Sequence, residues 1–271
     1  MTAADAVDVD ELRRELLRPG ALWCRLEVVA ETGSTNADLA ELARGGAHAG
    51  SVLVADHQTA GRGRQGRTWT APPGSGVAMS VLLRPRPDVP AGHWTWLPLI
   101  AGLAVAEGLR RTSGAPALLK WPNDVLVGER KVCGILAERV ETPADPACVI
   151  GMGINVTLGA YELPVPTATS LSILVADGLA RAVPSRTDLI ATVLAGLELL
   201  YLRWEAEAAN ASLAAAYRER SDTLGRRVRV LVAGDRLVEG VADDIDPDGR
   251  LVVRTSSGVE TLSAGEVINL R

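Results

Sequence analysis

Phenylalanine is absent from this chain of 271 residues, and aromatic residues of all kinds make up only 3% of it. Leucine, valine and alanine must therefore form most of the core. Hydrophobic residues reach 47%, which is enough for a large core without disulfide or metal support. We attach no function to the missing phenylalanine.

Cysteine is also scarce, and no Cys-x-x-Cys spacing occurs among Cys24, Cys133 and Cys148. An odd number of cysteines without that spacing argues against a disulfide framework and against a structural zinc site. The three histidines show neither a metal-ligand spacing nor a partner set for a nucleophile. This composition fits a protein of the reducing cytoplasm.

No apolar stretch is long enough to cross a membrane. The longest, residues 94–106, is too short for a bilayer and predicts a buried helix. The N-terminus carries acidic residues where a secretory signal has basic ones. The formal net charge is −5, whereas proteins that bind bulk nucleic acid tend to be basic. We therefore expect a cytoplasmic protein without membrane association and without nucleic acid as its main partner.

The hydrophobic pattern predicts helices and strands in mixed order through most of the chain. Serine or threonine precedes three of the predicted helices as an N-cap: Ser34 or Thr35, Ser170, and Ser185 or Thr187. Helices are expected over 8–18, 36–42, 94–111, from 171, and from about 187 to 220. Strands are expected over 24–30, 51–56, 76–83, 117–120, 132–140 and 148–156.

The pattern changes at Gly225, where Val228, Val230 and Val232 alternate with polar residues. Turn signals follow at 233–235, 246–249 and 256–258. Short strands at this spacing predict a small β-barrel. We therefore predict two domains, residues 1–222 and 223–271.

The most informative segment runs from His57 to Trp69, where three glycines alternate with three arginines before the tryptophan. Glycine lets the backbone come close to a ligand. Arginine offers donors that fit carboxylates and phosphates, and tryptophan offers a surface on which a base can stack. The loop suits an anionic nucleotide adduct. An RNA-binding strip and a solvated basic loop are the alternative interpretations.

A second motif is Lys120-Trp121-Pro122-Asn123-Asp124. A cation, an amide and a carboxylate together can handle a nucleotide and its metal, since aspartate is a usual Mg²⁺ ligand beside phosphates. The alternatives are a simple turn and a surface lysine. Lys131 follows at the mouth of an apolar strand, where it is well placed to meet a carboxylate. A strand-end lysine that prevents edge pairing is the alternative there.

Two weaker motifs complete the set. The run from Gly151 to Asn155 has two glycines of a dinucleotide fingerprint but lacks the third, which favours a strand whose backbone approaches a ligand. Ser34-Thr35-Asn36 predicts a helix cap, and its hydroxyls and amide also suit recognition of a small polar ring. Glu138 is expected to be structural or to support the site, and nothing marks Cys133 as a nucleophile.

In this order, the four motifs resemble those of the biotin protein ligases, over roughly residues 25–175. The resemblance implies an α+β fold: a mixed sheet flanked by helices, of the class II synthetase/biotin ligase type, followed by a small SH3-like β-barrel. It implies that the carboxylate of biotin attacks the α-phosphate of MgATP, giving biotinyl-5′-AMP and pyrophosphate. A lysine of a biotin carboxyl carrier domain, from an acetyl/acyl-CoA or pyruvate carboxylase, then takes the biotinyl group.

The resemblance also implies roles for single residues. The catalytic candidates, with Asp124 as the metal contact, are Lys131, Arg64, Arg67, Lys120 and Asp124. The candidates for binding biotin and ATP are Ser34, Thr35, Asn36, Gln58, Gly61, Arg62, Gly63, Arg64, Trp69, Asn123, Lys131, Gly134, Gly153 and Asn155. Among these, the motif 34–36 and Gln58 are expected at the ureido ring, and Trp69 at the adenine.

Val132-Cys133 stands where the family more often has Leu-Ala, and both pairs are small or apolar. The stretch before the first predicted strand is too short for a helix-turn-helix domain, so we expect a ligase without operator binding. A monomer and a ligand-linked homodimer are both compatible with the sequence. The alternatives in function are a lipoate or octanoate protein ligase or transferase, and a non-enzymatic biotin-sensing regulator.

Overall fold

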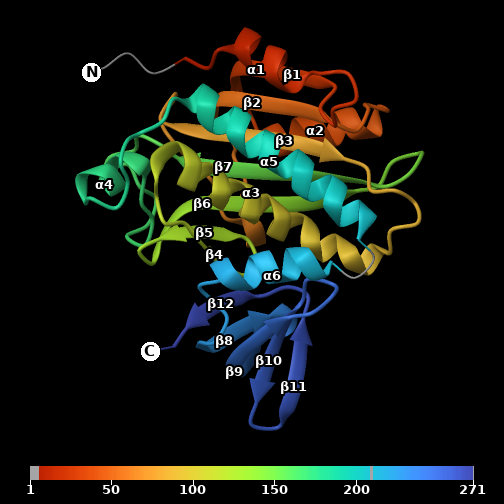
Figure 1. Ribbon diagram of the computed structural model, residues 1–271, viewed down its shortest axis with the longest axis vertical. Helices are drawn as coiled ribbons and strands as arrows, with labels where there is room; N and C mark the ends of the chain where they lie inside the picture. Colours follow the sequence, from red (N-terminus) through yellow and green to blue (C-terminus); the bar gives the residue numbers. More distant parts are fainter. Residues whose placement is uncertain (1–5, 208–209, 271) are drawn as a thin grey trace.

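Seven strands form one mixed sheet in the first part of the chain (Figure 1). The computed structural model describes residues 6–207 and 210–270. The strands are β1 (Arg25–Thr32), β2 (Ser51–Gln58), β3 (Gly76–Leu83), β4 (Leu118–Lys120), β5 (Asp124–Val127), β6 (Arg130–Val140) and β7 (Ala147–Asn155). Their spatial order is β1-β2-β3-β7-β6-β5-β4, with β1 and β2 parallel and the other neighbours antiparallel. The predicted α+β class is confirmed.

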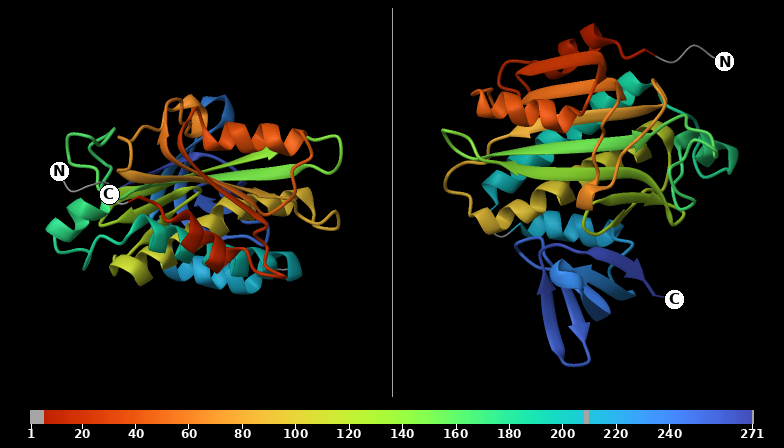
Figure 2. Two further views of the ribbon diagram at one scale, coloured as in Figure 1. Left: turned by 90° about the horizontal axis from the view of Figure 1, so that it is seen from above. Right: turned by 180° about the vertical axis from the view of Figure 1, so that it is seen from behind.

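Helices cover both faces of this sheet. They are α1 (Val9–Leu16), α2 (Thr35–Arg44), α3 (Trp96–Ser113), α4 (Leu171–Ala176), α5 (Arg186–Ala206) and α6 (Ala211–Arg220). Figure 2 shows α2 on one face, and α3 and α5 on the other. Strand alternation explains the division, because successive side chains point to opposite faces. Leu53 packs with α2, whereas Val52 and Val54 join the core beneath α3 and α5.

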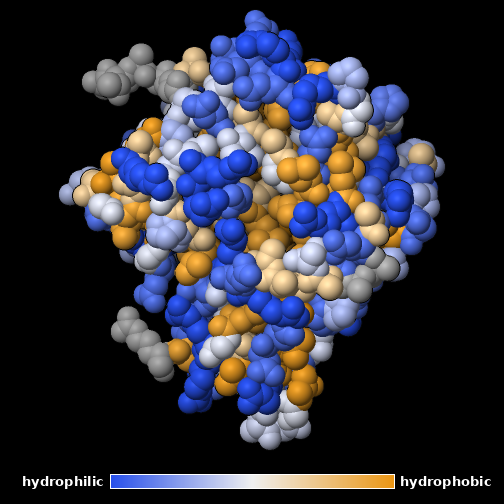
Figure 3. All heavy atoms as spheres, in the orientation of Figure 1, coloured by the Kyte–Doolittle hydropathy of each residue, from blue (hydrophilic) through white to orange (hydrophobic). Residues whose placement is uncertain are grey.

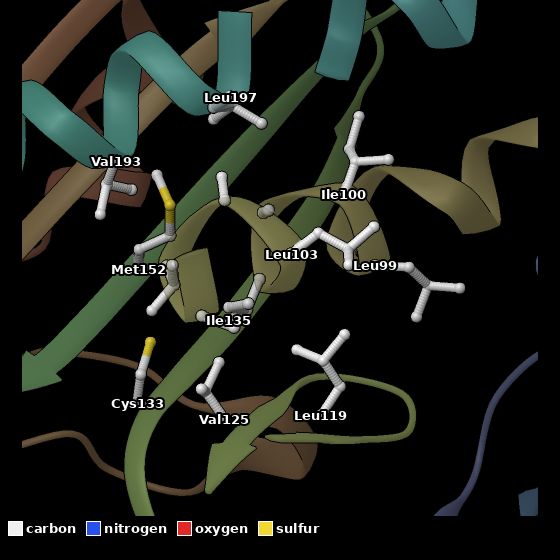
Figure 4. Close-up of a cluster of buried hydrophobic side chains, with 14 of the residues drawn as sticks. Leu99, Ile100, Leu103, Leu119, Val125, Cys133, Ile135, Met152, Val193 and Leu197 are labelled. Atoms are coloured by element: carbon white, nitrogen blue, oxygen red, sulfur yellow. The ribbon is translucent and has the colours of Figure 1, made fainter. Parts of the chain in front are cut away.

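The core under α3 explains the apolar run in the sequence. Ile135 of β6 and Met152 of β7 lie against Leu103 of α3 and Leu197 of α5 (Figure 4). Because α3 lies between the sheet and α5, nearly all of its faces are buried. Its length and position agree with the helix predicted over 94–111. On the outer face in Figure 3, apolar atoms gather over the α3 and α5 region, where Leu199 and Leu202 of α5 are exposed.

Serine caps three helices as predicted, because Ser34, Ser170 and Ser185 each accept a backbone N–H three residues on. The prediction of a single long helix up to residue 220 is wrong. The chain forms α5 and α6 instead, and Asn210 before α6 adopts a left-handed conformation that no continuous helix allows. Strand β5 was missed, because its first residue, Asp124, belongs to a segment that also resembles a turn.

The last part of the chain forms a five-stranded antiparallel sheet. Its strands are β8 (Arg227–Val232), β9 (Arg236–Ile245), β10 (Leu251–Thr255), β11 (Gly258–Leu262) and β12 (Glu266–Asn269), in the order β11-β10-β9-β8-β12. This matches the expected small SH3-like domain, although its five strands do not close into a complete barrel. Within the described residues the outer strands β11 and β12 do not pair, and the start of β12 lies at the pocket of the first sheet.

A turn of this second sheet fixes its position against the first. The indole N–H of Trp96 donates to the carbonyl of Pro247 at 2.8 Å, and that of Trp121 donates to the carbonyl of Gly249 at 3.4 Å. A side chain at position 249 would press on the Trp96 ring, since an added Cβ would lie 3.1 Å from it. Within residues 6–207 and 210–270, none of the helices is both long and apolar enough to span a membrane.

Candidate functional site

One pocket of about 430 Å³ collects all four sequence motifs. Every predicted site residue lines it except Gly61, which lies just behind, where an added Cβ would be 2.4 Å from the carbonyl oxygen of Trp69. The walls come from the start of α2, the end of β2, the first half of β6, the second half of β7, the segment 120–124 and the loop 61–69. Residues 265–267 of the second sheet close one side. The volume lies in the range typical of small-molecule sites.

Glycines make the floor of the pocket flat. An added Cβ at Gly151 would lie 2.2 Å from the Asn36 amide oxygen, and one at Gly153 would lie 2.5 Å from the ring of Trp69. An added Cβ at Gly134 would lie 2.9 Å from the Lys131 amine. The glycines therefore admit three neighbouring side chains rather than forming a dinucleotide fingerprint. The Trp69 ring lies against Gly153 of this floor, and its stacking on adenine stays a prediction.

One end of the pocket is neutral and almost fully buried. Thr35 and Asn36 begin α2, and Ser80 faces them from β3 with no exposed surface. The Ser80 hydroxyl donates to the Asn36 amide oxygen at 2.6 Å and lies 2.6 Å from the Thr35 hydroxyl. The Gln58 amide oxygen accepts the backbone N–H of Thr35 at 2.8 Å. Such a chain of satisfied polar groups can recognise a small polar ring without carrying charge.

The other end carries the charged groups. The Lys131 amine lies 2.7 Å from an Asp124 carboxylate oxygen, and both residues line the pocket beside Lys120. The Arg64 guanidinium donates to the Asn123 amide oxygen at 3.0 Å. Burial lowers the pKa of Arg64, while the charge of Asp124 partly opposes that shift. The guanidinium stays protonated in any case, so this end keeps a positive charge.

Hydrogen bonds within the loop 61–69 fold it back on itself. The backbone N–H of Gly63 donates to the Arg67 carbonyl at 2.7 Å, and that of Trp69 donates to the Gly61 carbonyl at 2.9 Å. Carboxylates hold the loop at two points. Arg62 pairs with Glu138 of β6 at 3.0 Å, and Arg67 pairs closely with Glu266 of β12. The hydrogen bond from Arg67 lowers the pKa of Glu266.

Two predicted amides already have protein partners. The Asn155 side-chain N–H donates to the Thr169 carbonyl at 2.9 Å, and that of Asn123 donates to the Ile135 carbonyl at 3.0 Å. Both residues line the pocket, so their role toward a nucleotide stays a prediction. Burial raises the pKa of Cys133, which keeps its thiol protonated. This agrees with our expectation that it is no nucleophile.

Sequence reasoning missed Ser80, Gly151 and Glu266 and left Glu138 without a definite role. A serine inside the otherwise apolar strand 76–83 was a usable signal for Ser80. Gly151 belongs to the motif that runs to Asn155. Glu266 gave no signal, because it is 199 residues from its partner Arg67 in the sequence.

The comparisons with known proteins agree with this geometry. Residues 28–155 match the biotin/lipoate A/B protein ligase family, and residues 223–268 match the biotin protein ligase C terminal domain. The chain is 45% identical to the biotin–[acetyl-CoA-carboxylase] ligase of Mycobacterium tuberculosis, over 98% of this chain and 96% of that protein. The chain belongs to the biotin protein ligase family.

Other members of the biotin protein ligase family are also similar. The bifunctional ligase/repressor BirA of Bacillus subtilis is 32% identical over 86% of this chain and 70% of that protein. The structure of the biotin protein ligase from Aquifex aeolicus, in complex with biotin and ATP, superposes with a TM-score of 0.76 at 29% identity. It covers 92% of this chain and 100% of that one. The lipoate or octanoate alternative is not favoured, because these relatives are biotin ligases.

Proposed function

We propose that this chain joins biotin to a lysine of a biotin carboxyl carrier domain, with ATP as the energy source and biotinyl-5′-AMP as the intermediate. The observation that most strongly supports this proposal is the division of one pocket into a neutral, buried end and a cationic end. The neutral end around Thr35 and Gln58 suits an uncharged cyclic urea. The cationic end around Lys131 and Arg64 suits a carboxylate and a triphosphate that must meet.

In the first step a carboxylate oxygen of biotin attacks the α-phosphorus, and the bond from that phosphorus to the β-phosphate oxygen breaks. Two anions must approach each other, so positive side chains have to offset their repulsion. We assign Lys131 to the biotin carboxylate, and Arg64, Arg67 and Lys120 to the phosphates. Asp124 holds the Lys131 amine in place through the 2.7 Å contact.

Magnesium is expected to arrive with ATP. Mg²⁺ is usually held by one or two carboxylates together with substrate phosphates, and when bound it neutralises phosphate charge. In the described part of the chain, no three acidic, histidine or cysteine side chains cluster as a metal site. One carboxylate at the phosphate end, Asp124, fits this mode of binding as a single ligand beside the phosphates.

In the second step the lysine amine of the carrier attacks the acyl carbon of the mixed anhydride, and AMP leaves. Adenylates hydrolyse in water, so the loop 61–69 has to cover the intermediate until the carrier arrives. The acceptor is the carrier domain of an acetyl/acyl-CoA or pyruvate carboxylase. We place the enzyme in the cytoplasm, as a monomer or a ligand-linked homodimer. We expect no specific DNA binding, and the net charge of −5 supports that expectation.

We also propose a catalytic domain of residues 1–222 and a C-terminal domain of residues 223–271. The strands of the first sheet end at Asn155 and those of the second begin at Arg227, which supports a boundary between them.

Mass measurement tests the proposal directly. The protein is incubated with biotin, MgATP and a carrier domain, and the mass of the carrier is then measured by mass spectrometry. We expect a gain of one biotinyl group on one lysine, together with release of pyrophosphate. Lipoate in place of biotin is the control and should give no gain. A carrier that gains lipoyl but not biotinyl mass, or no mass at all, would overturn the assignment.

A further inference from the structure

A buried chain of hydrogen bonds runs from Glu138 to the neutral end of the pocket. The Asn36 side-chain N–H₂ donates to a Glu138 carboxylate oxygen at 2.7 Å and to the Leu136 carbonyl at 3.2 Å. A carbonyl and an ionised carboxylate accept hydrogen bonds and cannot donate them. These two acceptors therefore fix the orientation of the amide, and the Asn36 oxygen must face Ser80.

The orientation of Asn36 decides where the next hydroxyl proton goes. Ser80 has one hydroxyl proton, and it donates that proton to the Asn36 oxygen at 2.6 Å. The Thr35 hydroxyl lies 2.6 Å from the same Ser80 oxygen. Ser80 has no proton left for this contact, so its oxygen can only accept from Thr35. The Gln58 amide oxygen, 3.0 Å from the Thr35 hydroxyl, is a second acceptor within reach. The single Thr35 proton is therefore directed at a protein acceptor, Ser80 or Gln58.

The neutral end thereby acquires a defined polarity. Because the single proton of Thr35 is directed at Ser80 or Gln58, its hydroxyl oxygen presents lone pairs and acts as an acceptor. Gln58 differs, since its oxygen accepts the backbone N–H of Thr35 at 2.8 Å and its NH₂ group remains a donor. Both residues line the pocket. A cyclic urea offers two N–H donors and one carbonyl acceptor, which complements this pair.

Glu138 also holds the loop. The carboxylate oxygen that accepts from Asn36 accepts from the Arg62 guanidinium at 3.0 Å. One oxygen thus joins the buried network behind the ring site to the first arginine of the covering loop. Gly151 makes room for this arrangement, since a Cβ there would lie 2.2 Å from the Asn36 oxygen.

We propose that Glu138 is a positioning residue for biotin: through Asn36 and Ser80 it holds the Thr35 hydroxyl in place at the ring site, and through Arg62 it keeps the loop over the ring. The inference rests on the proposed function. It assigns to Glu138 an effect on biotin binding rather than on the chemical step or on ATP.

Steady-state pyrophosphate release, with biotin and ATP varied in turn, tests the inference. Leucine at 138 removes the acceptor, whereas glutamine keeps an amide oxygen that both donors can reach. We expect E138L to raise the KM for biotin between about fivefold and a hundredfold, since it leaves a buried donor short of a partner. Its kcat and its KM for ATP should stay within about threefold, and E138Q should stay near wild type in biotin KM, by the same reasoning.

Further variants separate the effect of Glu138 on the ring site from its effect on the loop. S80A breaks the chain to Thr35 and leaves the Arg62 contact, so it should raise the biotin KM without faster proteolysis of the loop in ligand-free protein. E138L should show both effects. The matched control is E141L, because Glu141 is an exposed residue just after the same strand, paired with Arg139 at 2.7 Å. It should show neither effect.

The outcomes are distinct. A biotin KM for E138L no higher than that for E141L would overturn the inference, as would an E138Q as weak as E138L. If E138L does not fold, an unchanged biotin KM in S80A overturns the inference, and a raised KM with normal loop proteolysis supports it. A wild-type enzyme that releases no pyrophosphate with biotin and MgATP contradicts the proposed function itself.

Discussion

The two ends of the pocket differ in how their side chains are held. At the ring end, Thr35, Asn36 and Ser80 are buried, uncharged and fixed by short hydrogen bonds to each other. At the phosphate end, Lys131, Arg64 and Arg67 are charged, and each has a protein partner while still lining the pocket. A buried neutral network changes little when a ligand enters. The charged pairs can instead exchange their partners for substrate anions.

The two ends should therefore control different properties of the enzyme, namely the affinity for biotin and the rate. Changes at the ring end should act on biotin affinity, because its groups contact an unreactive part of the substrate. Changes at the phosphate end should act on the rate, because the charge at the reacting atoms changes during the reaction.

The largest effect is expected for Lys131→Ala. Removing one group that stabilises transition-state charge typically costs about 10²–10³ in kcat, and we expect that loss in biotin-dependent pyrophosphate release. The KM for biotin should change far less. Arg130→Ala is the matched control, because that neighbour pairs with Asp177 at 2.5 Å on the surface and should leave the rate near wild type. Wild-type pyrophosphate release in Lys131→Ala would remove Lys131 from its role.

A middle-sized effect should separate two glycines of the floor. Gly151→Ala presses on the Asn36 amide, and we expect it to raise the biotin KM about tenfold, as overpacking commonly costs 1–3 kcal/mol. Gly153→Ala presses on the Trp69 ring, so its effect should fall on the KM for ATP. Gly92→Ala is the control, since its Cβ meets nothing within 4 Å. Equal effects of both variants on both KM values would argue against two separate ends.

Some regions of the structure can be predicted from the sequence more fully than others. Local signals suffice where neighbours in the chain share a role: serine caps, the apolar helix α3 and the strand 76–83 follow directly from the residues. The four motifs gather in one pocket because strands β2, β6 and β7 end or pass there. Ser80 and Gly151 were visible in the sequence but had no assigned role, because their partner Asn36 comes from a distant element.

Long-range charge pairs are beyond any local pattern. Glu266 lies on an edge strand of the second sheet and meets Arg67 only after both sheets have packed together. The open edge of that sheet was missed for a related reason, since alternating residues predict strands but not whether the outer two will pair. The break between α5 and α6 is marked by the extended backbone of Glu207 and the left-handed backbone of Asn210, and a helical pattern tolerates both residue types.

The smallest effect is expected for Glu266→Gln, which weakens the hold on the far end of the loop. The pair is exposed, and such pairs contribute about 0–1 kcal/mol, so cleavage within residues 61–68 of ligand-free protein should rise at most about fivefold. Biotin should protect the loop in both proteins. Glu260→Gln, which breaks a similarly exposed pair with Arg236, is the control and should not change the cleavage.

The dependence of this effect on pH follows from the lowered pKa of Glu266. A carboxyl whose pKa is lowered in the folded state stabilises the loop fully above its ordinary value of 4.5, and that contribution is lost as the pH falls through the lowered pKa. Cleavage of the wild-type loop should therefore approach that of Glu266→Gln only in this acidic range, with an acid-stable protease as the probe. Equal rates for the two proteins at neutral pH would mean that the loop is held from the ring end alone, through Arg62 and Glu138.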